Sequence, residues 1–256
     1  MVKLLAVLMF LLSLSAVSFA DDHSGDTPLS PLALQVNMCE LNEGFDEDDL
    51  SRLDQRYLAW AEENDVQRTF VRQTPLMFPR ALERPTYFDF HLGTHELTGQ
   101  VWKKWLRSED GRKLNAEWQK IATCRVVMTT LFRRYAEGEP QAGDQRVVGI
   151  NWCNKNEGKT WDQLRERHDR AAQSGGPSNG EAVFWGLIVP RVGGQDLPGD
   201  FAHVMTFNDM ERFMAYQRWF DLEGGSASYG DYNSSYATCL GPSIFVEDVI
   251  HMTPDL

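Results

Sequence analysis

The sequence predicts an α+β protein made of two tandem copies of one β-α-β-β-α-β unit. Two observations carry this prediction. The motif N-x-C-x-x-N-E-G occurs twice, beginning at Asn37 and at Asn151, 114 positions apart. The residues that follow each motif then predict the same order of strands and helices.

Further matches follow the two motifs in the same order along the chain. Their offsets stay close to that of the motif, and the slippage falls in expected loops. The matched positions are Leu50 and Leu164, Pro75 and Pro190, His91-x-x-Thr94 and His203-x-x-Thr206, and Thr123-Cys124 and Thr238-Cys239. An ordered series of this kind favours duplication over the alternative of two unrelated domains.

The elements of the first copy follow from their residue patterns. Leu34, Val36 and Met38 alternate with polar residues, which predicts a half-buried strand. Apolar residues spaced three and four apart predict the helices. The other expected elements are a helix over 46–63, strands over 69–74 and 87–93, a helix broken near Gly111, and a strand over 125–133.

The second copy repeats this order. Residues 136–145, rich in Gly, Glu and Pro, are expected to link the two copies, which span 32–135 and 146–256. The expected elements are strands over 147–152, 182–189, 201–207 and 243–250, and helices over 161–173 and 209–220.

The order β-α-β-β-α-β is that of the ferredoxin-like split motif, whose sheet carries helices on one face only. Two copies can cover each other by packing sheet to sheet. On this element order and duplication, residues 32–251 resemble the dimeric α+β barrel superfamily, which includes antibiotic-biosynthesis monooxygenases and EthD-like and NIPSNAP-like proteins. The resemblance implies an intramolecular barrel in a pseudo-twofold monomer. It carries over no catalytic residue, because no family-specific catalytic signature is present.

The first twenty residues are typical of a secretory signal peptide. Lys3 precedes an apolar run from Leu4 to Val17, and Ser18-Phe19-Ala20 supplies small residues for cleavage after Ala20. Residues 21–31 are polar and are expected to form a flexible tail. The net charge of −12 argues against nucleic acid as a partner. We therefore expect an exported protein, periplasmic or secreted, without membrane insertion once the signal is removed.

Four cysteines in an exported chain predict two disulfides. In a ferredoxin-like sheet the last strand lies antiparallel beside the first, which brings the end of one next to the start of the other. This predicts the pairs Cys39–Cys124 and Cys153–Cys239, each stabilising the fold by roughly 4–5 kcal/mol through loop closure. The cysteine and histidine spacing does not indicate a redox pair or a metal site, and no cofactor is expected.

Strand alternation suggests where a pocket could lie. If Leu34, Val36 and Met38 face the helices, Asn37 faces the opposite sheet. By the same reasoning Asp89 and His91 point inward. Because first and third strands are neighbours, Asn37 should lie near His91, and Asn151 near His203. Such polar groups could bind a ligand or supply a general base, or could be hydrogen-bonded groups within a filled core.

Other polar residues are weaker candidates. Glu43 and Glu157 follow the first strand of each copy and could act at the mouth of a barrel, although Asn-Glu-Gly also makes a good turn. His168 lies among charged residues and is expected on a solvated helix face. His95 has no histidine counterpart in the second copy.

Three functions are compatible with these features. The first is the binding of a small, partly aromatic molecule between the two sheets. The second is a cofactor-free oxygenase or isomerase with His91 or His203 as base. The third is a module that binds a cell-envelope protein through its acidic surface. The first is favoured, because no nucleophile–base–orienter set is visible. A cavity between the sheets would support the first two functions.

Overall fold

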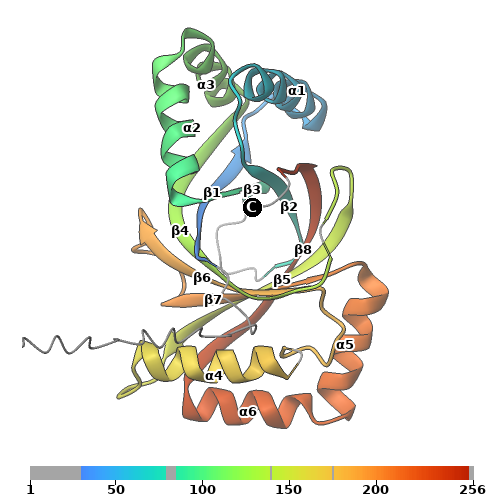
Figure 1. The fold of residues 1–256 in the computed structure, drawn as a ribbon. Coiled ribbons are helices and arrows are strands. Elements are labelled where there is room, and N and C mark those ends of the chain that lie inside the picture. Colours follow the sequence, from blue (N-terminus) through green and yellow to red (C-terminus); the bar gives the residue numbers. More distant parts are fainter. Residues whose placement is uncertain (1–29, 79–84, 139, 175, 254–256) are drawn as a thin grey trace, which may run out of the picture.

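The computed structural model describes residues 30–78, 85–138, 140–174 and 176–253. The expected signal peptide and most of the expected tail lie outside these residues. In the described part of the chain, eight strands close into one barrel and six helices lie against it (Figure 1). The architecture is therefore mixed α+β, as the sequence predicts.

The first half of the barrel comes from residues 32–136 and the second half from residues 145–251. The elements of the first half are β1 (Leu32–Leu41), α1 (Glu47–Glu63), β2 (Thr69–Met77), β3 (Tyr87–Gly93), α2 (His95–Arg107), α3 (Glu109–Ile121) and β4 (Ala122–Ala136). Those of the second half are β5 (Gln145–Lys155), α4 (Trp161–Gln173), β6 (Phe184–Val192), β7 (Phe201–Phe207), α5 (Met210–Leu222), α6 (Gly225–Ser235) and β8 (Ala237–His251).

Each half contributes four antiparallel strands, in the orders β4-β1-β3-β2 and β8-β5-β7-β6. The halves join edge to edge, because β2 pairs with β8 and β4 pairs with β6. Helices α1 to α3 cover the outside of the first half and α4 to α6 the outside of the second (Figure 1). Closure leaves no free strand edge in this barrel.

The strands face opposite to the sequence prediction. Leu34 and Val36 point into the barrel, where they pack with Phe90 and Val204. The alternate residues lie under the helices, as Phe70 does in a cluster with residues of α1, α2 and α3. Alternation fixes which residues share a face but not which face is the inside. In a closed barrel both faces are buried, so burial does not distinguish them either.

Both predicted disulfides are confirmed. Cys39 is bonded to Cys124, and Cys153 to Cys239. Each pair joins directly opposite residues of the first and last strand of its half. The prediction that the end of the first strand lies beside the start of the last strand in each half is therefore confirmed.

The asparagine of each Asn-Glu-Gly turn holds the same connection. The Asn42 side chain accepts a hydrogen bond from Thr123 Oγ1 at 2.9 Å and donates to the carbonyl of Lys120 at 2.9 Å. In the second half, Asn156 accepts from Thr238 Oγ1 at 2.9 Å and donates to a carbonyl at the end of α6. The repeated asparagine thus joins the end of the first strand to the start of the last.

The helices differ from prediction in two places. The helix broken near Gly111 is two helices, because Ser108 ends α2 and its side chain caps α3. Helix α6, whose Gly- and Ser-rich sequence favours a loop, was not predicted. A Cβ at Gly225 would lie 2.6 Å from Phe220 Cα, so only glycine permits the close turn from α5 into α6. Among the described helices, none is long and apolar enough to cross a membrane.

Candidate functional site

His91 lies beneath the helices of the first half and not inside the barrel, so its predicted orientation is wrong. Its ring stacks on Phe70 with centroids 4.5 Å apart and meets the edge of Tyr57 from α1. The residue opposite His91 on β1 is Gln35, not Asn37. Burial, with the positive charges of Arg68 and Arg72, holds the pKa of His91 well below its usual value.

Asn37 and Asp89 lie directly opposite each other on the same outer face. Asp89 is fully buried and accepts two hydrogen bonds from Arg72, at 2.7 and 3.1 Å. The same guanidinium pairs with Asp54 of α1, at 2.5 and 3.0 Å. Burial raises the pKa of Asp89 to about 6, although the Arg72 guanidinium acts to lower it. The predicted site residue Asp89 is therefore one end of a buried Asp–Arg–Asp triad.

In the second half, Asn151 does lie opposite His203, as predicted, but on the helix side. His203 Nδ1 accepts a hydrogen bond from Trp185 Nε1 at 3.1 Å, and its Nε2 lies 3.1 Å from the Tyr232 hydroxyl. The Asn151 amide donates to Tyr229 and accepts from the Gly241 amide. Both imidazole nitrogens of His203 are thus occupied.

His168 is buried and not solvated as predicted, because its side of α4 turns toward the barrel wall. Its Nε2 lies 2.8 Å from the Tyr232 hydroxyl. The Trp185 contact leaves the proton of His203 on Nε2, so His203 donates to Tyr232, and Tyr232 donates to His168. Burial lowers the pKa of His203 to about 4 and that of His168 to about 2, so both stay neutral near pH 7.

The symmetry relation between the two halves also needs correction. Strand register places Asp89 and His203 at equivalent positions, since each lies opposite the asparagine of its motif. The equivalent of His91 is Met205. The third strands of the two halves are thus offset by two residues relative to the sequence match. His91 and His203, which match in sequence, do not occupy equivalent positions in the structure.

Glu43 and Glu157 are exposed in the turns after β1 and β5 and line neither of the two cavities described below. In the described residues, one group of metal-ligating types comes together, formed by Cys153, His203 and Cys239. The two sulfur atoms are bonded to each other, and both ring nitrogens of His203 are hydrogen-bonded, so this group offers no free ligand atom.

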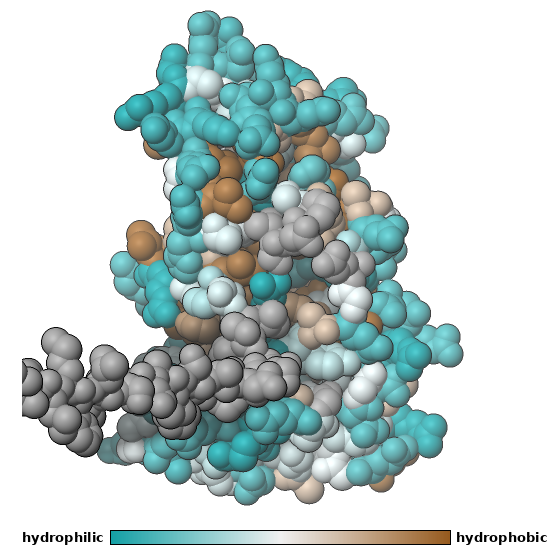
Figure 2. Space-filling view, viewed as in Figure 1, coloured by the Kyte–Doolittle hydropathy of each residue, from teal (hydrophilic) through white to brown (hydrophobic). Residues whose placement is uncertain are grey.

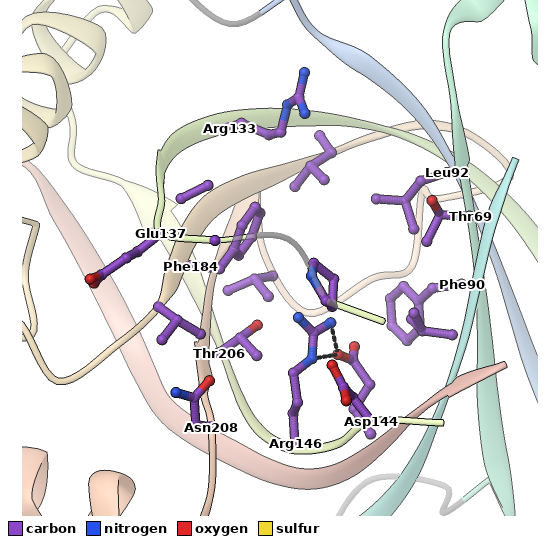
Figure 3. A pocket seen from close by; sticks show the side chains of 18 of the residues that line it. Thr69, Phe90, Leu92, Arg133, Glu137, Asp144, Arg146, Phe184, Thr206 and Asn208 are labelled. Atoms are coloured by element: carbon purple, nitrogen blue, oxygen red, sulfur yellow. Dashed lines mark hydrogen bonds and ion pairs between the residues drawn. The ribbon is translucent and has the colours of Figure 1, made fainter. Parts of the chain in front are cut away.

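The interior of the barrel holds a cavity of about 870 Å³, which falls within the range of small-molecule sites. Its walls are mainly apolar and come from both halves. They include Phe90 and Phe184, which lie on opposite sides of the cavity in Figure 3. The apolar wall further includes Leu32, Leu34, Val71, Leu92, Leu131, Val183, Ile188, Val204 and Met252.

Three polar side chains from three strands meet in this cavity. Gln73 Nε2 donates to Glu247 Oε2 at 2.7 Å, and Arg146 Nε donates to Glu247 Oε1 at 3.0 Å. The dashed lines at Arg146 in Figure 3 mark its contacts with the carboxylate. Because the carboxylate can only accept, it fixes the orientation of the Gln73 amide. Gln73 Oε1 is then a buried acceptor without a hydrogen-bond partner among the described residues.

The cavity opens between the end of β4 and the loops before β6 and after β7. Charged groups gather there, and Arg212 pairs with Glu181 at 3.0 Å. Arg133, Glu137, Asn208 and Asp144 also lie around the cavity (Figure 3). In the space-filling view, hydrophilic residues cover most of the helices at both ends, and hydrophobic residues show in small groups between them (Figure 2).

Sequence reasoning missed Gln73, Arg146 and Glu247. A usable signal was present for two of them, because Gln73 and Glu247 each interrupt an apolar row at every second position, whereas Arg146 precedes such a row. Glu247, for example, stands between Phe245 and Val249. A charged residue on an otherwise apolar strand face indicates a polar group that the fold buries deliberately.

No protein-family model and no curated protein matches this chain. Among solved structures, a protein provisionally assigned as a monooxygenase from Lactobacillus acidophilus superposes with a TM-score of 0.57 at 6% identity, over 88% of this chain and 99% of that one. A second provisional monooxygenase, from Fusobacterium nucleatum, gives a TM-score of 0.50 at 7% identity, over 86% and 93%. A heme-binding protein from Thermus thermophilus gives 0.48 at 11% identity, over 87% and 94%.

At such identities the likeness concerns the fold. The protein has the dimeric α+β barrel fold, formed within a single chain.

Proposed function

We propose that the protein binds a small, partly apolar or aromatic molecule in the barrel cavity between its two halves. The observation that carries the proposal is the buried Gln73 Oε1, which has no hydrogen-bond partner among the described residues and belongs to a side chain that lines a cavity of about 870 Å³. An unsatisfied buried acceptor costs free energy, and a ligand that donates to it would recover that cost. The apolar walls would supply affinity, and the Gln73–Glu247–Arg146 cluster would orient the molecule.

The enzyme alternative loses its proposed base. His203 has both ring nitrogens occupied, and neither His203 nor His91 lines the barrel cavity. A filled interior would have favoured the alternative of a surface interaction module, whereas the interior contains a cavity.

Native mass spectrometry of the protein purified from its own host should reveal a co-purifying small molecule. An aromatic fluorescent probe such as anilinonaphthalene sulfonate should bind to the emptied protein. Val204→Trp, which fills the apolar wall, should abolish binding, whereas Met214→Trp on the exposed face of α5 should leave it unchanged.

Gln73→Leu should weaken a hydrogen-bonding ligand about tenfold, because one buried hydrogen bond is lost. Equal binding by wild type, V204W and Q73L would place the ligand outside the barrel and contradict the proposal.

We also infer that the two halves arose by duplication and that the mature protein is an exported monomer. Equivalent disulfides and equivalent asparagine contacts at Asn42 and Asn156 support the duplication. The two disulfides support an oxidising compartment. Closure of the barrel within one chain supports a monomer, because no strand edge of the barrel remains to be paired. Light scattering and N-terminal sequencing of the exported protein test these inferences, and a dimer mass or an uncleaved leader would contradict them.

A further inference from the structure

A second, smaller cavity lies on the opposite face of the first-half sheet, between the outside of β1 and β3 and the helices. Its volume is about 150 Å³. Buried polar side chains form the floor, namely Gln35, Asn37, Arg68 and His91. Aromatic rings form the walls, namely Tyr57, Trp102, Trp105 and Trp118. The mouth is lined by the exposed residues Asn115, Gln119 and Val126. The two cavities have no lining residue in common.

Arg68 brings a buried positive charge to this floor. Its side chain is 8% exposed and donates to two neutral acceptors, Gln35 Oε1 at 3.2 Å and the Tyr57 hydroxyl at 3.4 Å. In the part of the chain that the structure describes, no carboxylate lies within 4.0 Å of it. Arg72, four residues later, has two such carboxylates. Buried charges are normally paired, and no anion among the described residues neutralises Arg68.

His91 adds a second unsatisfied group. The residue is 3% exposed, and its Nδ1 is buried without a hydrogen-bond partner among the described residues. The lowered pKa keeps the imidazole neutral, so one nitrogen donates and the other accepts. A guanidinium and an imidazole donor together suit an anion that accepts several hydrogen bonds.

We propose that this cavity is a binding site for a small organic monocarboxylate. Its carboxylate pairs with Arg68 and His91, and its short apolar chain lies against the tryptophan walls. The volume equals that of about five water molecules, which admits a carboxylate of roughly four to six non-hydrogen atoms. Asn37 and Asn115 can hydrogen-bond a further polar group on such a ligand.

Propionate is the probe, and propionamide is its neutral match in shape. Isothermal titration of the whole protein should give millimolar binding of propionate and at least tenfold weaker binding of propionamide. Indole N–H signals of ¹⁵N-tryptophan-labelled protein should shift for Trp102, Trp105 and Trp118 and stay fixed for Trp185 of the second half. Equal binding of the two probes, or displacement of propionate by equimolar chloride, would overturn the carboxylate assignment.

Two variants locate the site. Arg68→Gln should weaken propionate at least tenfold. Because a buried substitution could disturb folding, Asn115→Trp tests the same point from the exposed mouth and should block binding without changing the floor. Ala116→Trp, on the same helix and outside the lining, is its control and should bind as wild type does. Unchanged binding in N115W would place propionate elsewhere and refute the proposal.

This inference does not depend on the barrel ligand. Val204→Trp should leave propionate binding intact, and N115W should leave the barrel probe intact. Either proposal can therefore fail without the other.

Discussion

The two halves of the barrel bury equivalent polar groups against their helices but satisfy them differently. In the first half, Asp54 and Asp89 are bridged by the guanidinium of Arg72. In the second half, the equivalent positions are His168 and His203, bridged by the hydroxyl of Tyr232. The position equivalent to Arg72 is Leu187, since each lies opposite the equivalent residue of the third strand.

The buried network is thus charged in the first half and neutral in the second. Two carboxylates need a cation between them, whereas two neutral imidazoles need a group that both donates and accepts. The neutral network is satisfied internally. The charged half contains a second buried arginine, Arg68, for which the described residues supply no carboxylate partner, and this half also holds the small polar cavity. The two halves therefore differ more in how their buried polar groups are paired than in their fold.

The largest expected effect is that of Arg72→Leu. The variant leaves two buried carboxylates without their cation, and we expect a loss of about 3–5 kcal/mol in the free energy of unfolding. Urea denaturation measures it. The triple variant D54L/R72L/D89L removes all three charges and should recover most of that loss. A single-variant loss below about 1 kcal/mol would show that the triad is not electrostatically coupled.

The next effect is a pH dependence that belongs to the second half. The pKa of His203 is lowered to about 4 in the folded protein, so the unfolded chain binds more protons below about pH 6.5. Stability from this residue is therefore complete above pH 6.5 and falls by roughly 2–3 kcal/mol as the pH drops toward 4. The lowered pKa of His168 acts in the same direction.

The raised pKa of Asp89 has the opposite sign, because its protonation favours the folded state. The measurement therefore compares urea unfolding of wild type and His203→Gln at pH 7.5 and pH 4.5. The variant should lose less stability than wild type over this interval. Equal losses would mean that His203 titrates normally.

A smaller effect is expected for Tyr232→Phe. Removing the hydroxyl leaves His168 and His203 without their shared partner, which should cost about 2 kcal/mol. Tyr236→Phe is the matched control, because Tyr236 stacks on Tyr232 and its hydroxyl has no hydrogen bond to any described residue. Its loss should stay below about 0.5 kcal/mol. Similar losses in both variants would contradict the bridging role.

The smallest effect tests where the halves agree. Asn42→Ala and Asn156→Ala each remove contacts to the start of the last strand, and each should cost about 1 kcal/mol. Thermal unfolding measures both. If the losses in unfolding free energy differ by more than about 1 kcal/mol between the two variants, the asparagine of the motif does not stabilise both halves equally.

The sequence alone determined the order of the strands, most of the helices and the two disulfides. These features depend on local pattern and on which strand ends must meet. Cys39 and Cys124 could be paired correctly because antiparallel neighbours bring those ends together in either orientation of the sheet.

Only the tertiary structure decided which face of each strand is inside the barrel. Alternation at every second residue separates the two faces of a strand but does not say which of them points inward. It also decided the register that pairs Asp89, and not His91, with Asn37. For the same reason, the polar residues found in the barrel cavity differ from the site residues that the sequence predicts. Gln73 and Glu247 are brought together by the β2–β8 junction, a contact between residues 174 positions apart that no local pattern encodes.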